Sequence, residues 1–411
     1  ATDVMMLSRY SDDTVASVGV VNQLLSLIFI LYGISTLGTS VLCSQYLGAH
    51  QKKNVMQTIG VSLLINLLVG LVVSAGLYVF APQLLGLMGL SPQLIDCGKV
   101  YMQIVGGFSF LQAIAMTLSA TLRSHNQAFY PMYVTLLMNV LNVAGNYLLI
   151  FGKFGFPALG APGAAVSTSV CRLIAMCLLG YLLFRKVVPD FSFKYLRPFP
   201  WDKVKNLMVV GLPAAGEQVS YNLSQVVITY FSVLIGTAAL TARTYAMNIV
   251  MFSYVFSIAL GNGAAICIGH LIGAEKDNAA YSVEKYSIWL SVIITVVISV
   301  FTALIGANIF QLLSPNPEVV KIGAAVLYVD IVLEIGRAVN ITSVDSLIAA
   351  GDVFYPFITG IIVMWGVATL CAYLLGVWWG WGLTGIWLAM ALDENIRAVI
   401  FERRWKSRKW Q

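Results

Sequence analysis

The chain has 411 residues, of which 59% are hydrophobic and only 10% are charged, and its formal net charge is +6. Soluble proteins carry about 25% charged residues, so this composition, with a mean hydropathy of +0.84, excludes an ordinary water-soluble protein. The basic residues lie beside apolar segments, which indicates a lipid bilayer as the partner and not a nucleic acid.

Apolar segments follow one another along the whole chain, and a bilayer-spanning helix needs about 20 such residues. We expect eleven helices, at approximately 17–43, 54–79, 97–121, 130–152, 161–185, 206–232, 242–268, 283–308, 321–348, 356–378 and 382–402. Residues 1–10 resemble the last turns of a further helix. The pattern predicts an all-α, polytopic membrane protein.

One polar, basic connection with three prolines, 185–205, is much longer than the others. We therefore expect an N-terminal lobe at 1–190, a cytoplasmic linker at 191–205, a C-terminal lobe at 206–402 and a basic tail at 403–411. Sixteen Lys and Arg residues fall on the side of the linker and tail, against five on the other side. Because positive charge gathers in cytoplasmic loops, we place the linker and the C-terminus in the cytoplasm and the protein in the inner (plasma) membrane.

The sequence carries no recognisable catalytic or metal-binding motif. The six cysteines and three histidines are dispersed, and the chain has no CxxC, HExxH, GxSxG or GxxxxGK[ST]. We expect no enzyme activity, no metal site and no cofactor. A polytopic membrane enzyme remains a distant alternative, which would need clustered acids or histidines at a membrane face.

The two halves of the chain repeat one another. LGTSVLCSQYLGA (37–49) matches NGAAICIGHLIGA (262–274), and LRSHNQAFYP (122–131) matches LIAAGDVFYP (347–356), with identical residues 225 positions apart. LGAPGAA at 159 aligns with WGLTGIW at 381, an offset of 222. Each offset spans six helices, which predicts a twelve-helix transporter built as two parallel six-helix repeats. On this count, helix one is largely missing from this chain.

Ionisable residues inside a bilayer are costly and therefore candidate functional residues. Glu217 follows Pro213 in the expected helix 206–232, and a polar stripe that includes Tyr221 and Gln225 shares its face. Burial disfavours the charged carboxylate, so Glu217 could exchange a proton for a substrate cation. A structural Glu that neighbouring hydroxyls satisfy is the alternative.

Two later helices carry more charge. Asp330, Glu334, Arg337 and Asp345 form one stripe on the expected helix 321–348, where Glu334 and Arg337 could pair. We assign Glu334 and Arg337 to the substrate cavity, with helix–helix pairing as the equally open alternative. On the last helix, a structural role is favoured for the acids and the arginine at positions 393, 394 and 397.

In their order and repetition, several motifs resemble the multidrug and toxin extrusion (MATE) transporters of the multidrug/oligosaccharidyl-lipid/polysaccharide exporter superfamily. The resemblance covers essentially the whole chain. It rests on TDVMMLSRYSDDTVASVG near the start, on NxxNxxxNYLLIFGxFGFPALGAPGAAVST at 139–168, on VGLPAAGEQVSYN at 210–222 and on LEIGRAVN at 333–340.

The resemblance implies a cation site in the first lobe. The Asp that the family carries late in its first helix corresponds to Asp3, an Asn–acid pair to Asn142 and Asn146, and a Thr to Thr168. Position 146 is Asn where many relatives have Asp, which weakens the case for Na⁺. Proton coupling through Asp3 survives this change. Asparagines that only join helices are the alternative interpretation.

The family implies a monomer that exports small organic cations or similar amphipathic compounds in exchange for H⁺, or less favourably Na⁺. A flippase for lipid-linked precursors is the alternative within the superfamily. Such a flippase would need a strongly cationic central cavity, whereas the arginines within the expected spans have acids plausibly nearby.

Overall fold

A computed structural model describes residues 6–7, 12–152, 155 and 157–411. The described residues form helices and no strands, and each of the eleven expected apolar segments is helical. Seven helices are long and apolar enough to cross a membrane, and one bent pair makes an eighth candidate span. The all-α membrane fold that the hydropathy predicted is confirmed.

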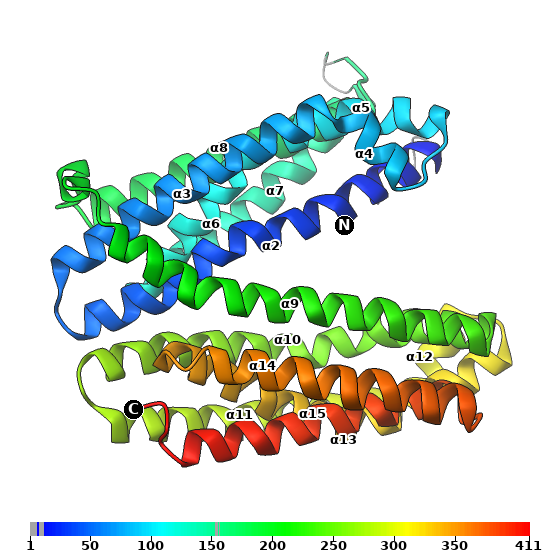
Figure 1. Cartoon of the computed structure of the whole chain (residues 1–411). Helices are drawn as coiled ribbons and strands as arrows, with labels where there is room; N and C mark the ends of the chain where they lie inside the picture. Colours follow the sequence, from blue (N-terminus) through cyan, green and yellow to red (C-terminus); the bar gives the residue numbers. More distant parts are fainter. Residues whose placement is uncertain (1–5, 8–11, 153–154, 156) are drawn as a thin grey trace. The chain divides into compact units, whose positions relative to one another are not determined.

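Contacts within the chain divide it into two compact units, one with residues 1–47 and 51–211 and the other with 48–50 and 212–411. The division falls a few residues after the predicted start of the second lobe at 206. The first unit contains α2 (Asp12–Gly48), α3 (Lys52–Val79), α4 (Ala81–Leu87), α5 (Pro92–Gly107), α6 (Ser109–Ser124), α7 (Phe129–Phe151), α8 (Ala161–Leu182), η1 (Leu183–Val187) and η2 (Phe193–Leu196) (Figure 1).

Helix α9 (Trp201–Ile235) begins in the first unit and continues into the second. The rest of the second unit contains α10 (Thr237–Gly273), α11 (Asp277–Leu304), α12 (Gly306–Leu313), α13 (Pro317–Ala350), α14 (Phe354–Val363), η3 (Met364–Thr369), η4 (Ala372–Trp378) and α15 (Gly382–Lys406). Helices α9, α13 and α15 are not among the seven apolar spans, because polar and charged side chains interrupt them.

The repeat in the sequence reappears in the helix boundaries. Helices α2 and α10 begin 225 residues apart and end 225 residues apart, and the same holds for α3 and α11. The turns also correspond, since His50 (φ 56°) and Glu275 (φ 58°) are both left-handed, as are Asn126 (φ 58°) and Gly351 (φ 96°). The members of each pair are 225 residues apart, so the two units have left-handed turn residues at equivalent positions.

The repeats differ at one bend. Helices α5 and α6 meet at Phe108 with an angle of 41°, whereas the equivalent α13 runs unbroken. Gly106 and Gly107 precede the bend, and the equivalent positions in α13 are Ile331 and Val332. A pair of glycines weakens helix stiffness and permits a kink.

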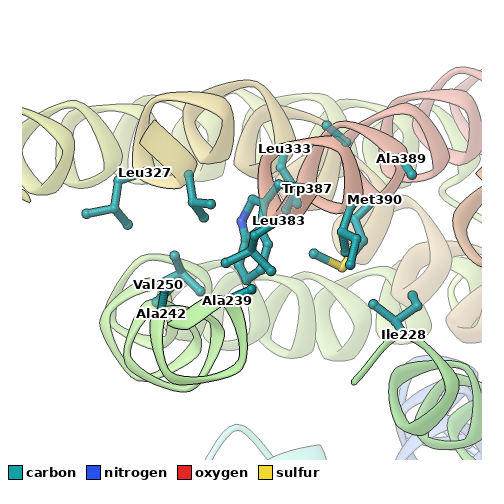
Figure 2. Close-up of a cluster of buried hydrophobic side chains, with 14 of the residues drawn as sticks. Ile228, Ala239, Ala242, Val250, Leu327, Leu333, Leu383, Trp387, Ala389 and Met390 are labelled. Atoms are coloured by element: carbon teal, nitrogen blue, oxygen red, sulfur yellow. The ribbon is translucent and has the colours of Figure 1, made fainter. Parts of the chain in front are cut away.

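The core of the second unit lies where α10, α13 and α15 meet (Figure 2). Trp387 of α15 is 1% exposed and packs with Leu333, Leu383 and Met390. These three helices are also close to one another at their small residues. A Cβ at Gly336 of α13 would lie 2.7 Å from the backbone nitrogen of Asn395 in α15.

The basic tail packs against the second unit. The rings of Trp405 and Trp410 stack with their centroids 4.3 Å apart, and both side chains are buried. Arg404 pairs with Asp352 at 2.7 Å, and Arg408 donates to Asn278 Oδ1 at 2.8 Å. The tail therefore holds the α13–α14 and α10–α11 turns together at one end of the unit.

The close contact at Gly336 predicts how an added methyl group at this position changes the stability of the protein. We expect Gly336→Ala to push α13 away from α15 and to destabilise the protein by about 1–3 kcal/mol, because a backbone atom blocks the added carbon. Thermal unfolding of the purified protein in detergent measures the loss. Gly263→Ala on α10 is the matched control, since nothing lies within 4 Å of its Cβ position. Equal unfolding temperatures for the two variants would contradict the close packing of α13 and α15.

Candidate functional site

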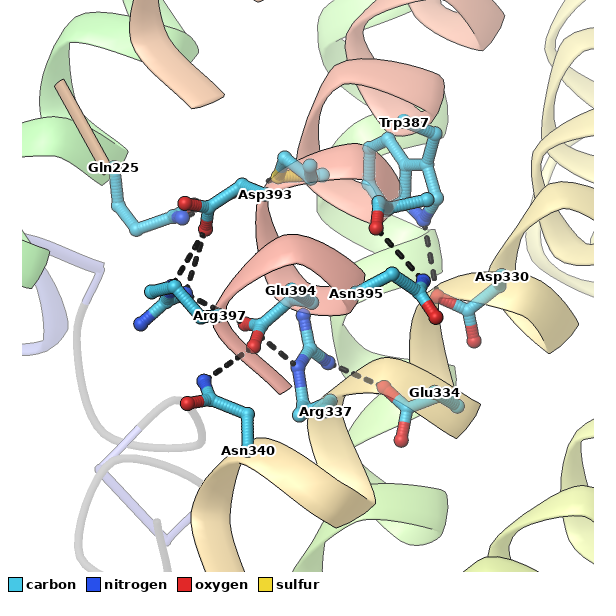
Figure 3. Close-up of polar contacts among 12 residues, drawn as sticks. Gln225, Asp330, Glu334, Arg337, Asn340, Trp387, Asp393, Glu394, Asn395 and Arg397 are labelled. Carbon is cyan, nitrogen blue, oxygen red and sulfur yellow. Dashed lines mark hydrogen bonds and ion pairs between the residues drawn. The ribbon is translucent and has the colours of Figure 1, made fainter. Parts of the chain in front are cut away.

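A network of buried ion pairs joins α13 to α15 (Figure 3). Glu394 Oε1 of α15 lies 3.5 Å from Arg337 Nε and 3.2 Å from Arg397 Nη2. Arg337 also pairs with Glu334 on its own helix, and Arg397 Nη2 lies 2.6 Å from Asp393 Oδ2. Each helix thus contains an ion pair of its own, which for Glu334 and Arg337 is the alternative that the sequence left open, and Glu394 joins the two pairs across the helices.

An amide completes the surroundings of the central carboxylate. Asn340 Nδ2 donates to Glu394 Oε2 over 2.6 Å. Glu334, Arg337, Glu394 and Arg397 are all buried. A charge taken out of water needs partners of opposite sign, and removing one partner from a buried pair costs about 3–5 kcal/mol. These residues therefore stabilise the contact between α13 and α15 as well as one another.

Two other carboxyl groups stay outside this network. Glu217 of α9 and Asp345 of α13 make no hydrogen bond and no ion pair with any residue that the structure describes. Each carboxyl group lies against a glycine. Glu217 Oε1 is 3.3 Å from the Cβ position of Gly360, and Asp345 Oδ2 is 2.5 Å from that of Gly261. A side chain at Gly261 would take the room that the Asp345 carboxyl group occupies.

Asp345 lies within electrostatic reach of Glu217. The charge of Glu217 acts on Asp345, and the charges of Arg397 and Glu394 act on Glu217. Neighbouring carboxylates that are poorly solvated repel each other, and a proton on one of them removes the repulsion. The pair is therefore suited to bind and release a proton.

A further acid pair lies near the tail. The carboxyl groups of Glu284 in α11 and Glu402 in α15 lie within electrostatic reach of each other. Ser343 donates to Glu284 Oε1 at 3.4 Å, and Lys406 Nζ lies 2.6 Å from Glu402 Oε1. The sequence analysis did not single out this pair, because its members lie on different helices.

The two remaining residues that we assigned to the substrate cavity, Tyr221 and Gln225, have different surroundings. Tyr221 is half-buried on α9 and lies within electrostatic reach of Arg337, so it belongs with the ion-pair network. Gln225 instead accepts a hydrogen bond from Arg243 Nη2 at 2.9 Å. The Arg243 guanidinium lies over the Trp387 ring, 5.6 Å from its centroid. Arg243 pairs with no carboxylate in the described part of the chain.

In the first unit, the predicted amide cluster is close together. Asn142 Nδ2 donates to Thr168 Oγ1 at 3.2 Å, and Asn146 Nδ2 donates to Asn142 Oδ1 at 3.3 Å. The first of these contacts joins α7 to α8, and the second lies within α7. Asp3, the predicted carboxylate of this site, lies outside the described residues, so its part in the site stays a prediction.

A cavity of about 570 Å³ opens between α6, α7 and α8 of the first unit. Asn142 and Thr168 line it, but none of the five residues that we assigned to the substrate cavity does. Pockets of 300–1,000 Å³ suit drug-sized ligands. Among the described residues, the lining contains two arginines, three amides and two methionines, which are Arg123, Arg172, Gln112, Asn139, Asn142, Met116 and Met138.

Sequence reasoning missed the α6 wall of this cavity. Gln112, Met116, Ser119 and Arg123 are spaced by four, three and four residues, which places them on one face of α6. That spacing was visible in the sequence. A basic residue at the end of a helix also serves to orient the helix in the membrane, so the charge of Arg123 alone does not indicate a cavity wall.

The described residues contain no cluster of three or more His, Cys, Asp or Glu that could hold a metal ion. The ion-pair network is rich in acids, but arginine side chains occupy the space between them.

Comparisons with known proteins identify the family. The MatE family model matches residues 1–148 and 213–374. The uncharacterized transporter YisQ of Bacillus subtilis is 40% identical over 99% of this chain and 90% of its own length. A protein of Thermotoga maritima named probable multidrug resistance protein NorM is 24% identical over 100% of this chain and 88% of its own length.

The fold agrees with these matches. A crystal structure of a MATE protein in the bent conformation has a TM-score of 0.92 and 19% identity, and the match covers 99% of this chain and 90% of that one. The family model matches most of the chain, and a transporter with 40% identity covers nearly all of it. The chain therefore belongs to the MatE family and is a multi-pass membrane transporter, not an enzyme.

Proposed function

We propose that this chain is a multidrug efflux antiporter, which exports organic cations or similar amphipathic compounds in exchange for protons. The observation that carries the proposal is the pair formed by Glu217 and Asp345. Both lie in helices long enough to cross a membrane, and both lack a hydrogen-bond or ion-pair partner among the described residues. The charge of Glu217 also acts on Asp345. Ionisable groups of this kind inside a membrane are typical of proton pathways.

The pair offers a simple coupling cycle. A proton that enters from the acidic side neutralises one carboxyl group and removes the repulsion within the pair. When the site opens to the other side of the membrane, the proton leaves and the two carboxylates repel each other again. Pro213, four residues before Glu217, leaves a gap in the hydrogen-bond ladder of α9, where the helix can bend between the two states.

Two further features support this reading. Curated relatives such as those in Thermotoga maritima and Bacillus subtilis are named probable multidrug resistance proteins. A second pair of neighbouring acids, Glu284 and Glu402, also lies at the end of the second unit where the basic tail packs. We infer that this end faces the cytoplasm at the inner membrane, because the basic residues gather there, and that the protein acts as a monomer without a bound cofactor.

Export of lipid-linked precursors is the second candidate. One observation favours it, namely that two guanidinium groups line the cavity of the first unit. In the second unit, however, Arg337 and Arg397 are bound to carboxylates, so they offer little free positive charge for a pyrophosphate.

The first prediction concerns Glu217. We expect Glu217→Gln to reduce proton-driven export of a fluorescent organic cation from proteoliposomes by about tenfold or more, because the amide cannot take up the coupling proton. Glu318→Gln is the matched control, since Glu318 is exposed in the first turn of α13. Export by the Glu217 variant at the wild-type rate, with the protein shown to be folded, would rule out this residue as the coupling site.

The second prediction concerns the coupling ion. In the same proteoliposomes, we expect a pH gradient to drive dye movement and a Na⁺ gradient at equal pH to leave it unchanged, because the described amide cluster offers Na⁺ no carboxylate. Movement driven by Na⁺ alone would contradict proton coupling. If neither gradient moved the dye, the lipid-linked substrate would become the better hypothesis.

A further inference from the structure

The linker between the two lobes, residues 185–205, begins where a candidate membrane span ends. That span covers Ala161–Val187, and α9 starts at Trp201, near the other end of the linker (Figure 1). The linker is therefore close to the lipid headgroups at the membrane surface. Anionic headgroups attract Lys and Arg beside a span, and this attraction falls off within about 8 Å at physiological salt.

The linker is packed against α3. Gln57 Nε2 of that helix donates to the carbonyl oxygen of Tyr195 at 3.3 Å. A Cβ at Gly60 of α3 would lie 3.0 Å from the side chain of Leu196. These contacts give the linker a defined conformation at this end of the first unit, so the exposure of its side chains is a property of the fold.

The aromatic side chains of the linker contact one another and leave two rings exposed. The ring centroid of Phe191 lies 4.9 Å from that of Phe184 and 5.3 Å from that of Phe193. The rings of Phe199 and Trp201 meet edge to face at 4.8 Å. Phe193 is 69% exposed and Trp201 is 72% exposed. Aromatic rings of membrane proteins favour the headgroup layer, where the apolar body of the ring leaves water.

The linker also carries positive charge that the protein does not neutralise. It contains six basic and two acidic residues, which give it a net charge of +4. Lys203 is buried and pairs with Asp202 at 3.1 Å. The other basic side chains are exposed and form no ion pair with any described residue; they are Arg185, Lys186, Lys194, Arg197 and Lys205. Each of them is available to an anionic group outside the protein.

The basic tail at 403–411 combines tryptophan and positive charge in the same way, but the protein itself binds it. Trp405 and Trp410 are buried. Arg404 pairs with Asp352, and Arg408 donates to an asparagine of the second unit. The tail therefore has no exposed tryptophan to offer to a lipid, whereas the linker presents exposed rings beside exposed charges.

We propose that the linker is a docking surface for anionic phospholipid. Phe193 and Trp201 enter the headgroup layer, while Lys186, Lys194 and Arg197 pair with lipid phosphates. Rings and charges act together, because an aromatic ring prefers the interface and each nearby cation favours a lipid with net negative charge. A phosphatidylcholine headgroup attracts these cations less, since its choline offsets its phosphate. The inference concerns the lipid around the protein, and it goes beyond the export that we propose.

The test places a photoreactive side chain at position 193. The full chain, with p-benzoylphenylalanine in place of Phe193, is reconstituted in nanodiscs that hold equal amounts of phosphatidylglycerol and phosphatidylcholine with the same acyl chains. After irradiation, mass spectrometry counts the two lipid adducts. We expect phosphatidylglycerol adducts to exceed phosphatidylcholine adducts by about threefold or more. Position 78 is the control, since Tyr78 is exposed at the opposite end of α3, and its adduct ratio should be about one.

Charge substitutions connect the preference to the linker. We expect Lys186→Gln, Lys194→Gln and Arg197→Gln, combined in one chain, to bring the adduct ratio at position 193 to about one, because the cations that select the lipid are gone. The phosphatidylcholine adduct at position 193 should persist. It reports that the variant is folded and that the linker still contacts lipid.

A matched control removes the same number of charges elsewhere. Lys276→Gln, Lys285→Gln and Arg403→Gln replace three exposed basic residues of the second unit, and they should leave the ratio at position 193 within about twofold of the wild type. An equal loss of preference in both combined variants would overturn the inference. A ratio of about one at position 193 in the wild type would overturn it as well. If position 78 formed lipid adducts and position 193 formed none, the linker would not be a lipid surface, and an acidic protein segment would be the better partner.

Discussion

The contact between Glu394 and the two arginines of α13 and α15 is the interaction on which the second unit depends. These helices carry too much charge to cross a bilayer as isolated segments. They are stable together because Glu394 pairs with Arg337 and Arg397 and accepts a hydrogen bond from Asn340, while Glu334 pairs with Arg337 and Asp393 pairs with Arg397. The network replaces water as the partner of every charge that it buries.

This network also defines which acids are available for transport. Four carboxyl groups of α13 and α15 have partners, since Asp330 accepts a hydrogen bond from Trp387 and the others pair with arginine. Glu217 and Asp345 are left without a partner among the described residues, in room that Gly360 and Gly261 provide. The pair that we propose for proton exchange is thus a consequence of the ion-pair network, because Arg337 and Arg397, which could have neutralised it, are bound to other carboxylates.

The two repeats share helix boundaries but use equivalent positions differently. Where the second unit has Arg337 and Glu394 in a salt bridge, the first has Gln112 and Arg172 on the walls of a cavity. A bent helix made of α5 and α6 replaces the straight α13. Two copies of one plan therefore contain an ion-paired helix contact in one unit and an open cavity in the other.

The sequence alone was sufficient for the membrane class, the helices and the repeat, because hydropathy and spacing are local properties that each segment carries by itself. It also offered the Glu334–Arg337 pair as one of two interpretations, since residues three apart on a helix are neighbours. Only the tertiary structure decided that Glu394 joins Arg337 to Arg397, that Glu284 lies near Glu402, and that Glu217 and Asp345 have no partner among the described residues. The same is true of Arg123 and the cavity. Each of these depends on how neighbouring helices rotate and pack, and the charge pattern of a single helix does not contain that information.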